Sequence, residues 1–238
     1  MPIPRYTIIC SEKTLIARDT YQLRFTRPSD WTFKAGQFVL LDVPLQTNPT
    51  DIQTRAYSIA SKPDEQEILL IVKLKHGGRS STWVNEVLTI GSHVTMQGPF
   101  GNFVLPAVST SPYLFLATGA GVAPFRAMIL ELLTRDEPYP IDLIFGVRTD
   151  DELFWIPECT TLAAEHKRFN FHPTLTRAPE NWTGHRGRVQ TIAPLIIRDL
   201  QERTIYACGN PDMTKEVKPL ALEQWHIPKQ RLHIEGFI

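Results

Sequence analysis

The sequence predicts two domains, an antiparallel β-barrel followed by an α/β domain with a parallel sheet. Its 238 residues fit one large or two ordinary domains, and 42% of them are hydrophobic, enough for a core. Short apolar or alternating runs recur up to about residue 105, whereas strands alternate with helices after residue 112. The segment PAVSTSP (106–112) separates these patterns, so we place the domains at 1–106 and 107–238.

The first half contains six candidate strands and one helical segment. A closed or nearly closed antiparallel barrel explains strands at 6–10, 21–26, 36–43, 55–60, 68–74 and 93–98. In residues 81–88, helical spacing places Trp83, Val84, Val87 and Leu88 on one face.

In the second half, alternation implies a parallel sheet with helices on both faces. Strands are expected at 113–118, 141–147, 168–175 and 204–209, and helices at 122–133, about 158–167, about 190–200 and from 211. The first of these helices should bury Val122, Phe125, Met128, Ile129 and Leu132. Pro219 should bend or end the last one.

Composition excludes several classes of function. Lys plus Arg and Asp plus Glu both number 25, so no global field recruits nucleic acid or an anionic membrane. No secretion signal is recognisable and no apolar run approaches the roughly 20 residues of a membrane span, which predicts a cytosolic protein. The three cysteines, Cys10, Cys159 and Cys208, lack a CxxC spacing and are too few for a common iron–sulfur cluster, and the histidines show no ligand spacing. No metal is predicted.

A glycine-containing turn follows the strand at 113–118. Gly119 and Gly121 would let the backbone approach a phosphate, and the next helix offers free N–H groups. The turn is not an ordinary dinucleotide fingerprint, because Pro124 replaces the third glycine and Arg148 stands where the fingerprint has an acid. It is either a nucleotide site or a tight turn with structural duties only.

Cys208 should lie at the carboxyl end of the strand at 204–209, where open parallel sheets bind ligands. The alternative is that Cys208 is a small buried hydrophobe. Asn210, Pro211 and Asp212 are typical of a helix start, with Asn210 as the cap.

Taken in order, RAYS, GGRSS, GPFGNF, TGAGVAP, FGVR, TLTRAPENW, CGNPDM and a terminal EGF resemble the ferredoxin–NADP reductase superfamily, which includes flavodoxin and cytochrome b5 reductases. The resemblance covers nearly the whole chain. It implies FAD on the barrel, a nicotinamide nucleotide on the α/β domain, and hydride transfer from nicotinamide to flavin N5.

The resemblance implies that Arg55 pairs with the FAD phosphates, Tyr57 lies on the flavin ring and Ser58 hydrogen-bonds N5. Otherwise Arg55 forms a surface salt bridge and Tyr57 is a core ring. Strand alternation sends residues 55 and 57 to one face, where a plain core would not accommodate the charge. The remaining residues expected to contact FAD are Ala56, Val72, Lys73, Leu74, Gly77, Gly78, Arg79, Ser80, Ser81 and Thr82, of which Ser80, Ser81 and Thr82 open a helix towards the pyrophosphate or simply cap it.

For the nicotinamide nucleotide, the resemblance implies contacts from Thr118, Gly119 and Gly121, with Cys208 and Gly209 beside the nicotinamide ring. The chain ends with an acid two residues before an aromatic. Glu235 would relay protons to N5 and Phe237 would cover the flavin, unless this is an ordinary final strand. Ile238 departs from plant-type members, which end on the aromatic itself. The expected catalytic residues are Ser58, Cys208 and Glu235.

The preferred nucleotide follows from the segment TLTRAPENW. Cytochrome b5 reductases carry there an aspartate that disfavours the extra phosphate of NADPH, whereas this chain has Thr176, followed by Arg177. A hydroxyl and a cation, with help from Arg148, favour NADP(H) over NAD(H). A solvated Arg177 is the alternative.

The expected electron acceptor is a ferredoxin or flavodoxin-type carrier, or a small acceptor such as free flavin or a quinone. The expected protein is a monomeric NAD(P)H-dependent flavoprotein reductase. Two rival hypotheses are a non-catalytic flavin-binding electron-transfer subunit of a larger complex and a nucleotide-binding scaffold without flavin.

Overall fold

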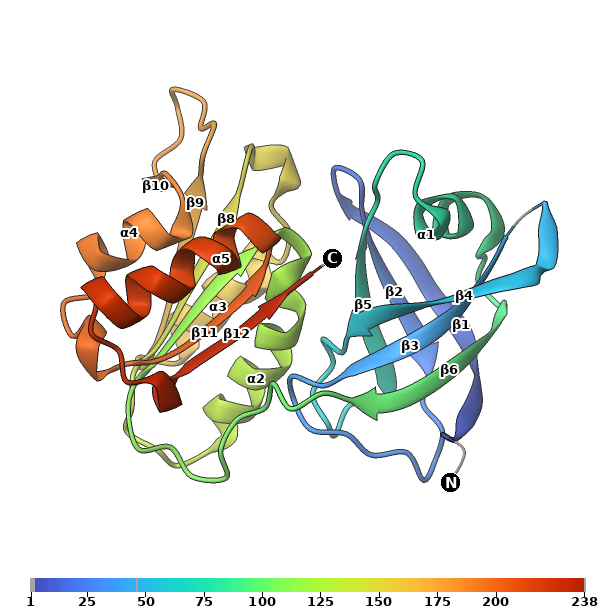
Figure 1. Cartoon of the computed structure of the whole chain (residues 1–238), viewed down its shortest axis with the longest axis horizontal. Coiled ribbons are helices and arrows are strands. Elements are labelled where there is room, and N and C mark those ends of the chain that lie inside the picture. Colours follow the sequence, from blue (N-terminus) through green and yellow to red (C-terminus); the bar gives the residue numbers. More distant parts are fainter. Residues whose placement is uncertain (1–2, 46, 238) are drawn as a thin grey trace. The chain divides into compact units, whose positions relative to one another are not determined.

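The computed structural model describes residues 3–45 and 47–237 of the chain. It divides into two compact units (Figure 1). Unit 1 comprises residues 1–105 with 126–128, and unit 2 comprises residues 106–125 with 129–238.

Unit 1 contains a six-stranded antiparallel sheet in the order β4-β3-β6-β1-β2-β5. The strands are β1 (Arg5–Ala17), β2 (Thr20–Thr26), β3 (Phe38–Leu45), β4 (Asn48–Ser58), β5 (Glu67–Lys73) and β6 (His93–Phe100). The two outer strands meet through an isolated bridge between Ile59, just past β4, and Leu70 of β5. This closure confirms the predicted nearly closed barrel.

Alternating residues of the strands fill the barrel. On β3, Val39, Leu41 and Val43 are fully buried, and they pack in one hydrophobic cluster with residues from the other strands. Alternation of this kind sends every second side chain to the interior. The barrel core therefore follows directly from the period of two in the sequence.

A short helix, α1 (Arg79–Thr82), continues as a π-helical turn over Trp83–Val87. The sequence predicts one helix over 81–88, and the structure begins it two residues earlier and widens its second half. Leu88 N–H donates to the Trp83 carbonyl at 2.8 Å, an i→i+5 bond. The wider turn brings Trp83 and Leu88 to the same side, and both are buried in the barrel core with Val84.

Unit 2 contains a six-stranded parallel sheet in the order β10-β9-β8-β7-β11-β12. Its strands are β7 (Tyr113–Thr118), β8 (Ile141–Val147), β9 (Phe169–Leu175), β10 (His185–Arg186), β11 (Thr204–Gly209) and β12 (Leu232–Gly236). The α-helices are α2 (Ala123–Thr134), α3 (Ile156–Glu165), α4 (Val189–Ile196) and α5 (Pro211–Pro219). The predicted α/β class is confirmed.

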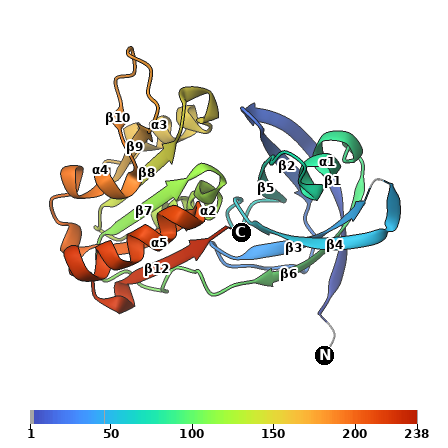
Figure 2. The same cartoon turned by 45° about the horizontal axis from the view of Figure 1, so that its top comes forward.

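Helices cover both faces of this sheet. Leu114 and Leu116 of β7 pack with Val189 of α4 and Met213 of α5 in one cluster. Phe115 points to the opposite face, where its ring centroid lies 4.9 Å from that of Phe125 on α2. Figure 2 shows α4 and α5 together on one face of the sheet. In open parallel sheets of this kind, ligands bind at the carboxyl ends of the strands.

Several boundaries differ from the prediction. The two-residue strand β10 carries no sequence signal. Helix α4 ends at Ile196 rather than near 200, because Pro194 has no N–H to donate inside it and the chain becomes extended at Ile197. Helix α5 ends at Pro219, as predicted, and continues as a π-helical turn over Leu220–Gln224.

Candidate functional site

The end of β4 carries the first group of candidate residues. Tyr57 is paired with Val39 and Arg55 with Leu41 across β3, so both lie on the face that those core residues share. Ser58 pairs with Phe38 on the other face and is buried. The structure therefore brings Arg55 and Tyr57 together on one face, and Ser58 next to them in the strand.

Arg55 carries a charge that no acid neutralises among the described residues. Its guanidinium donates to the Gln53 side-chain oxygen at 2.6 Å and to the Thr54 carbonyl at 2.9 Å, both neutral groups of the same strand. A partly buried arginine without an ion pair can accept a bidentate anion such as a phosphate.

The hydroxyl of Tyr57 is buried without a hydrogen-bond partner among the described residues. Burial raises the pKa of this phenol, while the nearby Ser80 hydroxyl and the Arg55 charge lower it by less. Ser80 lies close enough to influence the pKa but not in hydrogen-bonding geometry. A buried unsatisfied hydroxyl costs stability, so its place here fits a site that is completed by a ligand.

The loop before α1 is shaped by its own polar groups. The Ser81 hydroxyl accepts from the Lys75 N–H at 2.7 Å, and the Thr82 hydroxyl lies 3.4 Å from the Gly78 carbonyl. Gly77 has a φ of +70°, and a Cβ built on it would meet nothing within 4 Å. Ser81 and Thr82 are thus occupied in holding the loop, while the backbone at Gly77 is open.

Arg79 is directed elsewhere. Its guanidinium donates to both carboxylate oxygens of Asp51 at 3.0 and 2.9 Å, and to the Asp51 carbonyl at 2.9 Å. This bidentate bond lowers the pKa of Asp51 and raises that of Arg79. The pair joins α1 to β4, so in this structure Arg79 stabilises the loop and does not leave its charge free. Asp51 is not among the predicted site residues, because its only signal in the sequence is its negative charge.

The three candidates at the end of β5 differ in exposure: Val72 is buried, Leu74 is half-buried and Lys73 is exposed. Val72 is buried in the core and Leu74 packs against it, while Lys73 donates to the Arg18 carbonyl at 2.6 Å. Their backbone remains the part that can meet a ligand. Ala56 is exposed on β4.

In unit 2, the turn after β7 and the end of β11 touch each other. A Cβ on Gly121 would lie 2.2 Å from the Cys208 carbonyl oxygen, and one on Gly209 would lie 2.4 Å from the Thr118 carbonyl oxygen. The Asn210 N–H donates to the Thr118 hydroxyl at 2.8 Å. Gly121 and Gly209 are therefore required by packing between two strand ends.

Gly119 differs from its neighbour. Its φ is +52°, and a Cβ there would meet nothing within 4 Å. The turn continues as a 3-10 helix over Gly119–Val122 that leads into α2. Open space at the start of a helix is where a phosphate group can approach backbone N–H groups.

Cys208 and Glu235 lie opposite each other on β11 and β12. Burial raises the pKa of Cys208 well above its ordinary value, and the Glu235 charge raises it further. Burial also raises the pKa of Glu235. The Phe237 N–H donates to the Gly209 carbonyl at 2.9 Å, which prolongs the ladder. The structure thus groups Cys208, Gly209, Glu235 and Phe237 at one edge of the sheet. Ile238 lies outside the described residues.

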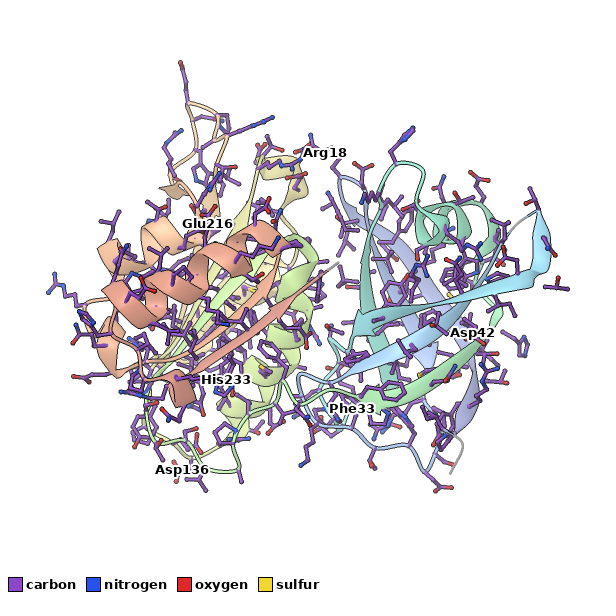
Figure 3. The ribbon with its side chains drawn as sticks, in the orientation of Figure 1. Arg18, Phe33, Asp42, Asp136, Glu216 and His233 are labelled. Atoms are coloured by element: carbon purple, nitrogen blue, oxygen red, sulfur yellow. The ribbon has the colours of Figure 1, made fainter. Side chains whose placement is uncertain are left out.

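A ring stack fixes β12 against β11. His233 (Figure 3) lies with its ring centroid 4.3 Å from that of Tyr206, at an interplanar angle of 15°. Burial lowers the pKa of His233, which favours the neutral imidazole in the stack. The stack of His233 on Tyr206 thus fixes the strand that carries Glu235, two residues further along β12.

The carboxyl ends of β8 and β9 carry the residues expected to choose between nucleotides. The Arg177 N–H donates to the Arg148 carbonyl at 2.7 Å, and the Thr176 N–H to the Val147 carbonyl at 3.1 Å. All of Arg148, Thr176 and Arg177 are exposed, and neither arginine forms an ion pair with a described residue. Two exposed cations and a hydroxyl are thus brought together by backbone bonds.

Residues 3–45 and 47–237 hold no cluster of three or more His, Cys, Asp or Glu suited to a metal ion. None of the helices among them is both long enough and apolar enough to cross a bilayer.

Both halves of the chain match known families. Residues 7–105 match the oxidoreductase FAD-binding domain, and residues 115–219 match the oxidoreductase NAD-binding domain. The chain is 33% identical over 212 residues to ferredoxin–NADP reductase B of Sorangium cellulosum, covering 86% of this chain and 85% of that protein.

Two further similarities add detail. The anthranilate 1,2-dioxygenase electron transfer component of Acinetobacter baylyi is 30% identical over 193 residues, 81% of this chain and 54% of that protein, so the chain spans about half of this relative. A ferredoxin NADP+ reductase from Neisseria gonorrhoeae, solved with bound FAD and NADP, superimposes with a TM-score of 0.82 at 21% identity and covers 98% of both chains. That likeness concerns the fold.

Proposed function

Since the chain belongs to the FAD- and NAD(P)-binding reductases of the ferredoxin–NADP reductase superfamily, we propose that it carries electrons from NADPH, through FAD, to a ferredoxin-type protein. The family makes it an NAD(P)H-dependent flavoprotein reductase. The choice of NADPH, the acceptor and the residues that act are the proposal.

One observation supports the flavin site most strongly: the end of β4 presents a guanidinium without an acid partner and a buried hydroxyl without a hydrogen bond. Among the described residues Arg55 has no acid partner and the Tyr57 hydroxyl is buried and unsatisfied, and Ser58 is buried beside them. Polar groups in such positions are satisfied when a ligand binds. The residues present therefore fit FAD.

When bound, FAD supplies a ring that accepts a hydride from reduced nicotinamide and passes electrons to an acceptor. Arg55 would hold the phosphates, and the open backbone at Gly77 would accommodate them. Tyr57 would lie against the ring. Ser58 would donate a hydrogen bond to its N5 position and so orient it.

In unit 2, Thr118 and Gly119 would meet the nicotinamide nucleotide at the start of the turn, and Cys208 and Gly209 would border the nicotinamide. Glu235 would hold or release a proton at its carboxylate, a role that its raised pKa favours because the neutral acid persists to higher pH. Phe237 is proposed to shield the flavin.

The preference for NADPH rests on two exposed arginines, Arg148 and Arg177, and on the hydroxyl of Thr176, which directly precedes Arg177. No described acid pairs with either guanidinium, so both remain available to a 2′-phosphate. Glu152 lies close, but its carboxylate accepts from the Arg148 backbone N–H at 3.0 Å.

A ferredoxin-type acceptor is supported by the relatives, one a ferredoxin–NADP reductase and the other an electron transfer component of a dioxygenase. The test is anaerobic reduction of the purified holoprotein by NADPH and NADH in parallel, followed by turnover with ferredoxin, flavodoxin, free flavin and a quinone. We expect bleaching of the flavin absorbance, faster with NADPH, and steady reduction of ferredoxin.

The outcomes separate the alternatives. Bleaching without turnover of any acceptor would support a subunit that acts only within a complex. Turnover of free flavin or quinone alone would make the chain a flavin or quinone reductase. A colourless protein that refuses added FAD would contradict the proposal altogether.

A further inference from the structure

The loop between β9 and β10 is folded around a single side chain. The Arg186 guanidinium donates to the carbonyls of Ala178 at 3.2 Å, Pro179 at 2.9 Å, Glu180 at 3.0 Å and Trp182 at 3.0 Å. Figure 1 shows this loop as an excursion beyond the ends of β9 and β10. The loop has no regular secondary structure, and the hydrogen bonds of one arginine side chain hold its backbone in place.

A second contact closes the same loop. The Trp182 N–H donates to the Pro179 carbonyl at 3.1 Å, and the Trp182 indole N–H donates to the His185 carbonyl at 3.0 Å. A Cβ on Gly184 would lie 2.6 Å from the indole ring, so only glycine leaves room for the ring there. The loop is therefore held in one conformation from both sides.

This loop begins at the residues proposed to choose the nucleotide. Thr176 and Arg177 are its first residues, and their N–H groups are bonded to the tip of β8. At the other end, Arg186 is paired with Leu175, the residue directly before Thr176. The Arg186 side chain thus ties the loop back to the strand position next to Thr176 and Arg177.

We propose that Arg186 is a positioning residue for the adenosine end of the nicotinamide nucleotide, which rests on the proposed function above. Its terminal nitrogens are occupied by carbonyls, so it acts through the loop and not as a phosphate ligand. It holds Thr176 and Arg177 in place, and it binds four carbonyl oxygens that would otherwise repel an incoming phosphate. Its fork of donors suits this task, whereas lysine is a point charge.

The test uses the FAD-loaded protein with Arg186→Lys, Arg186→Gln and Gly184→Ala. The last disturbs the loop through the Trp182 ring and leaves every charge unchanged. The control is Arg231→Gln, which removes an arginine–carbonyl bond to Glu202 of 2.7 Å elsewhere in unit 2. The measurements are KM and kcat for NADPH and NADH, the Kd of adenosine 2′,5′-bisphosphate by calorimetry, and the flavin absorbance.

We expect all three loop variants to raise KM and the Kd of the bisphosphate by about 3- to 10-fold, with kcat within about 2-fold of wild type, the pattern of lost binding without lost chemistry. The flavin absorbance and the behaviour of Arg231→Gln should match wild type. If Arg186→Lys binds the bisphosphate like wild type while Arg186→Gln does not, charge alone suffices and the positioning role is overturned.

Two other results are decisive. An equal loss in Arg231→Gln would mean general destabilisation and would overturn the inference. If the Arg186 variants do not fold, Gly184→Ala alone decides it: a raised Kd supports the inference and an unchanged Kd overturns it. Failure of the proposed function looks different, because then wild type itself would bind neither the bisphosphate nor NAD(P)H.

Discussion

The two candidate cofactor sites are built from different materials. At the end of β4, side chains make the site: a guanidinium without an acid partner, a buried hydroxyl without a hydrogen bond, and a buried serine. At the ends of β7 and β11, the backbone makes it: two glycines allow the strand ends to touch, and a main-chain N–H bonds the Thr118 hydroxyl. The first site depends on which side chains are present. The second depends on the absence of side chains, because Gly121 and Gly209 leave no room for a Cβ atom.

This difference has a consequence for mutation. Changes to the side-chain site should affect flavin binding first, because of its three residues only Tyr57 packs against the barrel core. Changes to the backbone site should affect the fold first, since its glycines fill packing positions. Four substitutions test this contrast, from the largest expected effect to the smallest.

Gly121→Ala should destabilise unit 2 by about 3 kcal/mol or more, because the new methyl group meets the Cys208 carbonyl, a backbone group that cannot swing away. Gly119→Ala is the matched control, with open space around it but a positive φ, and should cost only about 1 kcal/mol. Thermal unfolding followed by circular dichroism measures both. Equal losses would show that the close approach is not what requires glycine.

Arg55→Ala should weaken FAD binding by about 2 kcal/mol, or roughly 30-fold in Kd, since a charge-assisted contact to phosphate is lost. Arg55→Lys should recover part of the loss. The ratio of flavin to protein absorbance after gel filtration, and titration of the apoprotein with FAD, report the effect. Undiminished flavin in the alanine variant would contradict the phosphate contact and leave Arg55 a surface residue.

Tyr57→Phe should stabilise the protein without FAD but weaken its binding of FAD. Without FAD, removing a buried hydroxyl that has no partner should stabilise unit 1 by about 1 kcal/mol. With FAD, the same change should lower affinity by about 1 kcal/mol if the ligand satisfies that hydroxyl. Unfolding of the apoprotein and FAD titration separate the two effects, and a loss in the apoprotein would mean that the hydroxyl has a partner there.

Glu235→Gln should change how stability depends on pH. A carboxyl whose pKa is raised on folding contributes stability below its unfolded pKa, near 4.5, and loses it as pH rises through the folded pKa. The variant has no such loss. Its melting temperature relative to wild type should therefore increase by about 1–2 °C between pH 4 and pH 8. A difference that is flat with pH would mean that the carboxyl titrates normally.

The sequence predicted the fold well where the local pattern is strong. Helix α2 lies one residue from its predicted bounds, and all five residues expected in its core are buried there. The cap formed by Asn210 is also as predicted, with its side chain accepting from the Asp212 N–H at 2.7 Å. In these segments, the residues that determine the helix and its cap are neighbours in sequence, so the local pattern suffices to predict them.

Where structure depends on distant partners, the sequence was less informative. Strand β4 begins at Asn48, among exposed polar residues that alternate too little to be recognised. Strand β10 exists only because β9 lies beside it. In the site, residue types pointed to Arg55 and Tyr57, but the pairing of Arg79 with Asp51 and the packing reason for Gly121 depend on tertiary contacts that no spacing encodes.

The barrel of unit 1 is an open sheet whose two edges are joined by one isolated bridge between Ile59 and Leu70. Arg55 and Tyr57 lie on one of those edges, strand β4, and Val72 lies near the end of the other, strand β5. If FAD binds to both edges as proposed, its binding free energy also stabilises the closed barrel, so loss of FAD should lower the free energy of unfolding of unit 1. We therefore expect loss of the flavin and unfolding of the barrel to begin at the same place, the junction of β4 and β5.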